Sequence, residues 1–236
     1  MKFYSYKTYA EMCHHAANLI SAVMITKPNA VLGLATGSTP VGIYKELVEL
    51  NKKGDITFKD ITSVNLDEYC GLDGSHDQSY RYFMNTNLFN HVDIDKNKTF
   101  VPSGVSNDLK AEGEAYDKMI KDAGGIDIQL LGIGLDGHIG FNEPAPFFTK
   151  ETHVVDLHES TIKANARFFA SEDEVPKKAI TMGMMSIMQA KKVLLVANGA
   201  HKKEILEKSI FGEITPEVPA SILQLHPDLT VLFSEE

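Results

Sequence analysis

Hydrophobic and polar positions along the chain follow two alternating patterns. Short continuous apolar runs, typical of strands buried on both faces, occur at 30–35, 61–69, 126–134, 192–198 and 229–233. Between them, apolar residues recur with a helical period at 8–25, 40–54, 80–92, 106–125 and 199–211. This alternation predicts one α/β domain over residues 1–236, with a doubly wound, mostly parallel sheet covered by helices on both faces, similar to a modified Rossmann fold.

Composition narrows the classes of function. The chain has 236 residues and a net charge of −9, with no run rich in Lys or Arg, so we expect no nucleic-acid surface. No apolar stretch approaches the roughly 20 residues of a membrane span, and the N-terminus does not resemble a signal peptide. Cys13 and Cys70 are far apart and indicate reduced thiols. We therefore expect a cytoplasmic protein that does not bind membranes.

Polar residues come directly after the predicted strands, at the places where ligands usually bind. Ligands of open parallel sheets gather beyond the carboxyl ends of the strands. The residues found there are Thr36, Gly37, Ser38, Thr39, Asp67, Glu68, Asp136, His138, Asn142, Glu143, His201 and Lys202. Acids, hydroxyls, a histidine and a lysine are thus expected at one edge of the sheet.

The stretch LGIGLDGHIGFNEP at 131–144 contains the GxGxxG spacing of a dinucleotide-binding loop. Asp156 even lies about 20 residues downstream, where a ribose-binding acid belongs. However, that loop requires a helix directly after its third glycine, here Gly137. Pro144 and Pro146 fall inside the span of this helix, and each proline in a helix interior costs about 3 kcal/mol. The sequence therefore argues against a dinucleotide site.

The same stretch leaves three other interpretations open. Asp136, His138 and Glu143 offer a carboxylate–imidazole ligand set, although no HExxH pattern accompanies them. Alternatively, the histidine only hydrogen-bonds its neighbours. The third interpretation is acid–base chemistry, in which nearby carboxylates, including Asp67, fix the tautomer and proton affinity of His138.

The segment 33–40, GLATGSTP, offers backbone amides and hydroxyls just before a predicted helix. Such a loop is a natural anion site, and it lacks the GK[ST] ending of a nucleoside-triphosphate loop. A simple helix cap by Ser38 or Thr39 is the alternative. An anion site beside an acid–base cluster indicates a small phosphorylated substrate.

At these motifs the sequence closely resembles the glucosamine-6-phosphate deaminases, also called isomerases. The resemblance runs nearly end to end through GLATGSTP at 33, NLDEYCGL at 65, GIGLDGHIGFNEP at 132, NARFF at 165 and LQLHP at 223. It implies conversion of glucosamine 6-phosphate and water to fructose 6-phosphate and ammonium, without metal or organic cofactor. The shorter TGSTP is shared with 6-phosphogluconolactonase-like relatives and with sugar-responsive regulators.

The resemblance also implies roles for individual residues. Asp67 matches the base that moves a proton between C2 and C1, and His138 matches the residue that opens the pyranose ring. Asp136 and Glu143 match the carboxylates that orient this histidine. The implied phosphate-binding residues are Gly37, Ser38, Thr39, Arg167 and Lys202. Without the resemblance, Arg167 and Lys202 would be interpreted as parts of solvated helix faces.

Two alternatives and one departure from the family pattern remain. The alternatives are a 6-phosphogluconolactonase-like hydrolase or related amino-sugar phosphate isomerase, and a non-catalytic sugar-phosphate sensor, which would normally carry a DNA-binding domain. The departure is that His153 and Val155 stand where allosteric members carry an Arg and a Lys. We therefore expect no activation by N-acetylglucosamine 6-phosphate, and a monomer or small homo-oligomer. The segment 140–148 is expected to form a lid.

Overall fold

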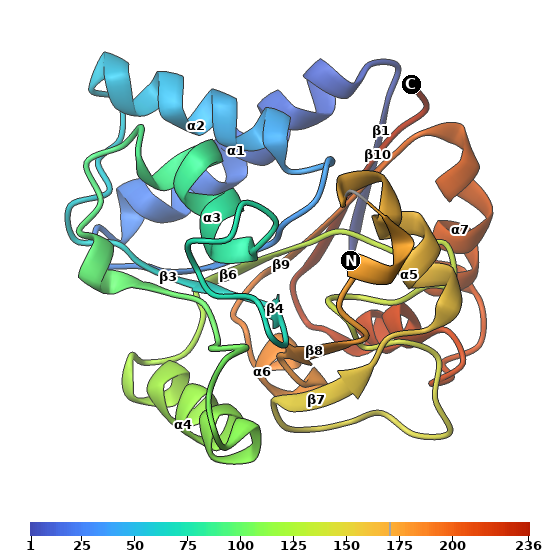
Figure 1. The fold of residues 1–236 in the computed structure, drawn as a ribbon. Coiled ribbons are helices and arrows are strands. Elements are labelled where there is room, and N and C mark those ends of the chain that lie inside the picture. The colour runs from blue at the N-terminus through green and yellow to red at the C-terminus, as the bar shows by residue number, and fades with distance from the viewer. Residues whose placement is uncertain (170) are drawn as a thin grey trace.

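The computed structural model describes residues 1–169 and 171–236, and it is built around a parallel sheet (Figure 1). In the described part of the chain this sheet has seven strands, and every neighbouring pair is parallel. Their order is β1 (Lys2–Tyr6), β10 (Leu229–Ser234), β9 (Val193–Asn198), β6 (Ile128–Leu131), β2 (Val31–Leu34), β3 (Thr62–Asn65) and β5 (Thr99–Phe100). The predicted parallel sheet is confirmed.

Helices cover both faces of the sheet, as the sequence predicts. Figure 1 shows α1 (Tyr9–Thr26), α2 (Val41–Lys53) and α3 (Tyr80–Met84) on one side of the central strands. The opposite side carries α4 (Leu109–Asp122) and α6 (Met184–Met188), and α7 (Lys203–Phe211) connects β9 back to β10. Because parallel crossovers are right-handed, the two directions of chain travel place their helices on opposite faces. The strand order therefore accounts for the two helical layers.

The direction of travel reverses between β2 and β6, which are neighbours in the sheet. From β2 the chain moves outward to β3 and β5, whereas from β6 it moves the other way, to β9 and β10. The loops after β2 and β6 therefore diverge and leave a crevice at the carboxyl ends of these strands. These loops are 35–40 and 132–143, the two glycine-rich segments that the sequence singles out.

The single strand expected over 61–69 is wrong. The chain leaves the main sheet at Leu66, whose amide donates to Leu34 O and whose carbonyl accepts from Met182 N. Beyond this point β4 (Asp67–Tyr69) belongs to a small antiparallel sheet in the order β4, β8 (Lys178–Thr181), β7 (His153–Asp156). The apolar run is continuous because both of its halves are buried, so the pattern does not reveal the change of sheet.

Several short elements were not predicted. β1 is an exposed edge strand without an apolar run, and β5, β7, β8, α5 (Glu159–Asn165) and α6 are too short for a clear period. The helix expected over 80–92 is α3 followed by a π-helical turn, Asn85–Phe89. The described residues also form 3-10 turns, which are Lys96–Lys98, Ala166–Phe168, Glu172–Glu174, Ala200–Lys202 and Pro219–Leu225. Among the described residues, no helix has the length and apolar character to cross a bilayer.

Candidate active site

Asp67 is the first residue of β4, at the point where the chain passes from one sheet to the other. It is only 5% exposed. Burial and, to a smaller extent, the charge of Glu68 raise the pKa of Asp67, the Thr181 hydroxyl opposes the rise, and the net result is a pKa of about 8. Asp67 is therefore a carboxyl group that holds its proton near neutral pH, which suits a residue that must both accept and return one.

Glu68, the next residue, is buried but extensively hydrogen-bonded. Its Oε1 accepts from the backbone amides of Tyr69 and Tyr80 at 2.9 Å each, and its Oε2 accepts from Arg81 N at 3.0 Å. Burial raises the pKa of Glu68 above its usual value, although these amides and the Arg81 charge oppose the rise. Because Tyr80 and Arg81 begin α3, Glu68 fastens this helix to the strand that carries Asp67.

Aromatic rings enclose this part of the site. Tyr80 stacks on Phe141 with ring centroids 5.9 Å apart at 12°, and Tyr69 lies 4.9 Å from Tyr80. The Tyr80 side chain interacts with Thr36 in the loop after β2 and with Tyr69. Burial and the negative charge of Asp67 raise the pKa of Tyr80, so its phenol stays protonated. Tyr69 and Tyr80 thus lie near enough to Asp67 for its charge to act on them, and Tyr80 also interacts with the loop at 35–40.

His138 and Asp136 form a second pair in the loop after β6. Nδ1 of His138 lies 2.7 Å from Asp136 Oδ1, a close electrostatic contact that is not aligned as a hydrogen bond, while His138 N donates to the same oxygen at 3.1 Å. Burial raises the pKa of Asp136, but its contacts with His138 outweigh this effect and lower it to about 2. Asp136 is thus ionised and holds the imidazole in one orientation.

Gly134 makes this orientation possible. A Cβ at Gly134 would lie 2.3 Å from the ring atoms Cε1 and Nδ1 of His138, so any side chain there would displace the imidazole. Residues 138–152, all of which the structure describes, contain no helix. The predicted lack of a helix after Gly137 is therefore confirmed, and the glycines bring the backbone close to His138 instead.

The loop after β2 leads into α2 through Gly37, whose φ is 100°. Within the described residues α2 has no side-chain cap, so neither Ser38 nor Thr39 caps this helix. The Tyr9 hydroxyl instead donates to Thr39 O at 2.8 Å and accepts from Gly42 N at 2.8 Å. The hydroxyls of Ser38 and Thr39 therefore remain available beside the N-terminus of α2, an arrangement that favours an anion.

Two cations approach the same edge from other elements. Lys202, in the 3-10 turn after β9, donates from Nζ to Ile133 O at 2.8 Å. Burial and the positive charge of Arg167 lower the pKa of Lys202, whereas the charge of Asp136 raises it. Arg167 itself packs over the Phe168 ring, with its guanidinium carbon 4.6 Å from the ring centroid. The two positive charges therefore repel each other, and an anion bound between them would relieve this repulsion.

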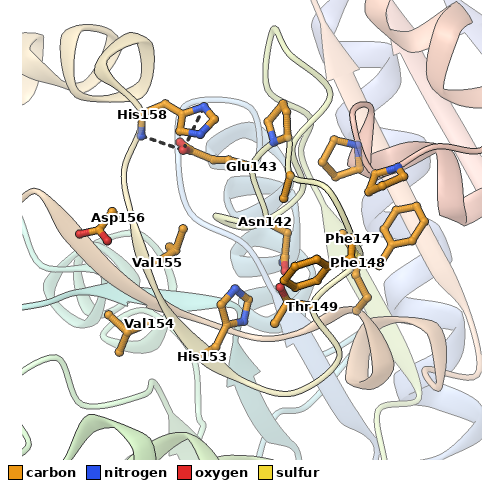
Figure 2. A pocket seen from close by; sticks show the side chains of 15 residues that line it. Asn142, Glu143, Phe147, Phe148, Thr149, His153, Val154, Val155, Asp156 and His158 are labelled. Atoms are coloured by element: carbon orange, nitrogen blue, oxygen red, sulfur yellow. Dashed lines mark hydrogen bonds and ion pairs between the residues drawn. The ribbon is translucent and has the colours of Figure 1, made fainter.

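Glu143 lies differently from the other predicted acids. Its Oε2 accepts from His158 N at 2.7 Å (Figure 2), and its Oε1 accepts from the Thr161 hydroxyl. Among the described residues it makes no hydrogen bond or ion pair with His138, and no group of three His, Cys, Asp or Glu side chains is arranged to hold a metal ion. Glu143 therefore anchors the loop at 142–149 to α5 in this structure, and its predicted action on His138 stays a prediction.

A cavity of about 250 Å³ lies between this loop and β7, and Figure 2 shows side chains that line it. Phe147, Phe148, His153, Val155 and Asp156 contribute to its wall, together with Glu143 itself. None of the described residues that line it is Lys or Arg. The described lining therefore combines apolar side chains with the carboxyl groups of Glu143 and Asp156.

Most of the residues predicted from the sequence gather at the sheet edge. Asp136 is in contact with His138 and acts electrostatically on Lys202, and the Asp67 carboxyl group lies close to Gly140, two residues after His138. Tyr80, Glu68 and Thr181 were not predicted as partners of Asp67, because their placement depends on β4 and β8, which the apolar pattern did not separate.

Comparisons with known proteins agree with this geometry. The family model described as glucosamine-6-phosphate isomerases/6-phosphogluconolactonase matches residues 5–232. The chain belongs to this family. A glucosamine-6-phosphate deaminase of Lachnoclostridium phytofermentans is 62% identical over 232 residues, which cover 98% of each chain. A second one, from Clostridium perfringens strain 13, is 55% identical over 98% of this chain and 95% of its own.

Solved structures of the same family have the same fold. A structure described as a monomeric glucosamine-6-phosphate deaminase superposes with a TM-score of 0.97 at 46% identity, covering 99% of this chain and 97% of that one. A 6-phosphogluconolactonase from Thermotoga maritima superposes with a TM-score of 0.76 at 19% identity, covering 100% and 99%. The second likeness shows the shared fold alone.

The raised pKa of Asp67 predicts that the free energy of unfolding depends on pH. The carboxyl has a pKa near 3.8 when unfolded and about 8 when folded, so the folded state binds the proton more tightly. The free energy of unfolding should therefore fall as the pH rises from about 4 to about 8. Asp67→Asn removes this term and should be more stable than the wild type at pH 8, by about 1 kcal/mol or more.

Urea unfolding of both proteins at pH 5 and pH 8.5 measures this difference. Asp122→Asn, an exposed change on α4, serves as the control. A stability gap between Asp67→Asn and the wild type that is the same at both pH values would contradict the raised pKa.

Proposed function

We propose that this protein is a glucosamine-6-phosphate deaminase, which converts glucosamine 6-phosphate and water to fructose 6-phosphate and ammonium. The observation that carries the proposal is the buried Asp67, with its pKa near 8, at the same sheet edge as the Asp136–His138 pair. The names of relatives 52–62% identical over nearly the full chain support it. The proposed substrate chemistry needs both parts of this site.

In the proposed first step the pyranose ring opens. His138, held by Asp136, takes the proton of the anomeric hydroxyl and delivers a proton to the ring oxygen, which leaves an aldehyde at C1. The C2 proton becomes acidic only after this step, because the carbonyl then stabilises the resulting carbanion. Ring opening therefore has to precede the action of Asp67.

In the second step Asp67 removes the C2 proton and returns a proton to C1. The first transfer gives an enolamine, and the second gives an imine at C2, which water hydrolyses to the ketone and ammonia. A base is most effective when its pKa lies near the working pH, which the burial of Asp67 provides. The ammonium group of the bound substrate would favour the ionised form of Asp67.

The phosphate is proposed to bind between the loop after β2 and the two cations. Gly37, Ser38 and Thr39 supply backbone amides and hydroxyls, and Arg167 and Lys202 supply positive charge. Burial and, to a smaller extent, the charge of Arg167 lower the pKa of Lys202, and a dianion there would offset the repulsion between the two cations. Binding energy at the phosphate then holds the flexible open-chain sugar against Asp67.

A 6-phosphogluconolactonase reaction would leave part of this site without a role. Hydrolysis of a lactone involves no proton transfer between C2 and C1, so a buried base such as Asp67 with Glu68 beside it would have no task. The lactonase structures are 17–22% identical to this chain, which shows the fold alone. The deaminase proposal therefore accounts for more of the described residues.

Ammonia release tests the proposal directly. Purified wild-type protein should form ammonia and fructose 6-phosphate from glucosamine 6-phosphate, and in D2O the product should carry solvent deuterium at C1. Asp67→Asn should still bind the sugar phosphate, as measured by calorimetry, but should lose roughly 10³-fold or more in kcat and all deuterium uptake.

Asp122→Asn should behave as the wild type in the same assays. Appreciable turnover with normal deuterium uptake by Asp67→Asn would remove Asp67 as the base, whereas an inactive wild type would contradict the proposed function.

We propose that no phosphorylated effector regulates the activity. The neighbouring structure is described as monomeric, and we propose that this chain is a monomer or small homo-oligomer. A phosphorylated effector requires positive charge, yet Val155 has none, and burial lowers the pKa of His153 below its usual 6.5. The described wall of the nearby cavity adds acids instead.

Initial rates should therefore depend hyperbolically on substrate concentration and should not respond to N-acetylglucosamine 6-phosphate. Rates measured with and without this compound check the point, with light scattering for the assembly. A sigmoidal curve that the compound converts to a hyperbola would show that an effector site exists without a basic pair.

A further inference from the structure

Thr181, the last residue of β8, lies at the junction of the two sheets. It is opposite Asp67 in the antiparallel register of β4 and β8, and it is fully buried. It is also opposite His153 of β7 on its other side. Its position is thus fixed from both neighbouring strands.

The Thr181 hydroxyl connects two parts of the proposed site. Phe141 N, in the loop after β6, donates to Thr181 Oγ1 at 3.0 Å. The same hydroxyl lies beside the carboxyl group of Asp67, its partner in the register of β4 and β8, and acts to lower the pKa of that group. A hydroxyl has one donor and two acceptor positions. Because the amide of Phe141 can only donate, the Thr181 proton is free to point to Asp67.

The backbone of the His138 loop is docked at this point. Gly140 has a φ of 58°, and a Cβ there would lie 3.0 Å from Thr181 Oγ1 and 3.2 Å from Asp67 Oδ2. The loop therefore passes directly over the pair, and the hydroxyl is the side-chain group that holds both the loop and the carboxylate.

We propose that Thr181 is a positioning residue for the proton transfer at C2. Its hydroxyl fixes the orientation of the Asp67 carboxylate and ties it to the loop that carries His138, so that the two groups face one substrate. This inference rests on the proposed function.

The charged and titratable groups around Asp67 determine in which direction its pKa should move when Thr181 is substituted. Glu68 on the same strand raises its pKa, and Tyr69, Tyr80 of α3 and Tyr116 of α4 all interact electrostatically with it. The Thr181 hydroxyl acts in the opposite direction, because a donor stabilises the ionised carboxylate. Removing this donor should therefore raise the pKa of Asp67.

Thr181→Val keeps the shape of the side chain and removes the hydroxyl, whereas Thr181→Ser keeps the hydroxyl. For Val we expect kcat to fall roughly tenfold or more, with KM changed little, and the acidic limb of kcat/KM to move up by about one pH unit. For Ser we expect both the rate and the pH midpoint to stay near those of the wild type.

Thr152→Val is the matched control, because the Thr152 hydroxyl makes a similar, partly buried bond to Asp117 of α4 and not to Asp67. It should lower the melting temperature without moving the pH midpoint. If Thr181→Val does not fold, Thr181→Cys replaces it, since a thiol is a weak donor. An unchanged pH midpoint and kcat in Val, or equal losses in Val and Ser, would overturn the inference.

The pH dependence of unfolding gives a readout that does not need activity. In Thr181→Val the fall in stability with pH should extend to higher pH than in the wild type, because the folded pKa is higher. Wild-type protein that forms no ammonia would contradict the proposed function. An unfolding profile equal to that of the wild type would contradict the role of Thr181 alone.

Discussion

The Asp67 carboxyl group is buried among aromatic and hydroxyl side chains. The proposed chemistry of the site depends on the free energy needed to ionise this group there. A carboxylate buried without a cation beside it keeps its proton to a higher pH. Here the neighbouring charge is Glu68, whose own ionisation is supported by three backbone amides. Asp136 is in the opposite situation, since the contact with His138 keeps it ionised down to a pKa of about 2. Two carboxyl groups at one sheet edge thus differ in pKa by several units, which separates the acid and base roles at neutral pH.

The fold brings these groups together through its strand order. Because β2 and β6 are neighbours from which the chain departs in opposite directions, their glycine-rich loops open away from each other. This crevice was predictable, because buried strands have a clear apolar pattern and the residues at their carboxyl ends can be read directly from the sequence. The surroundings of Asp67 were less predictable. They depend on the change of sheet at Leu66 and on β8, and neither interrupts the pattern of apolar residues.

Glu143 shows a different limit of prediction from the sequence. Its motif places it five residues after His138, but separation along the chain does not determine where a carboxylate in a glycine- and proline-containing loop points. In the structure its oxygens accept from His158 N and the Thr161 hydroxyl, in a segment far along the chain. Arg167 and Lys202 are the converse case. A net charge of −9 gave no sign of an anion site, yet two cations from separate elements act on each other at this edge. Local convergence, and not overall charge, is what a phosphate requires.

Burial makes Asp67 a base with a pKa near neutral pH, and direct titration of its carboxyl group tests this most directly. Protein labelled with ¹³C at the aspartate carboxyl carbons would be followed by NMR from pH 4 to pH 9.5, with the Asp67→Asn spectrum assigning the signal. We expect a midpoint near 8 for the free protein. A midpoint near 4, as for an exposed aspartate, would contradict the claim.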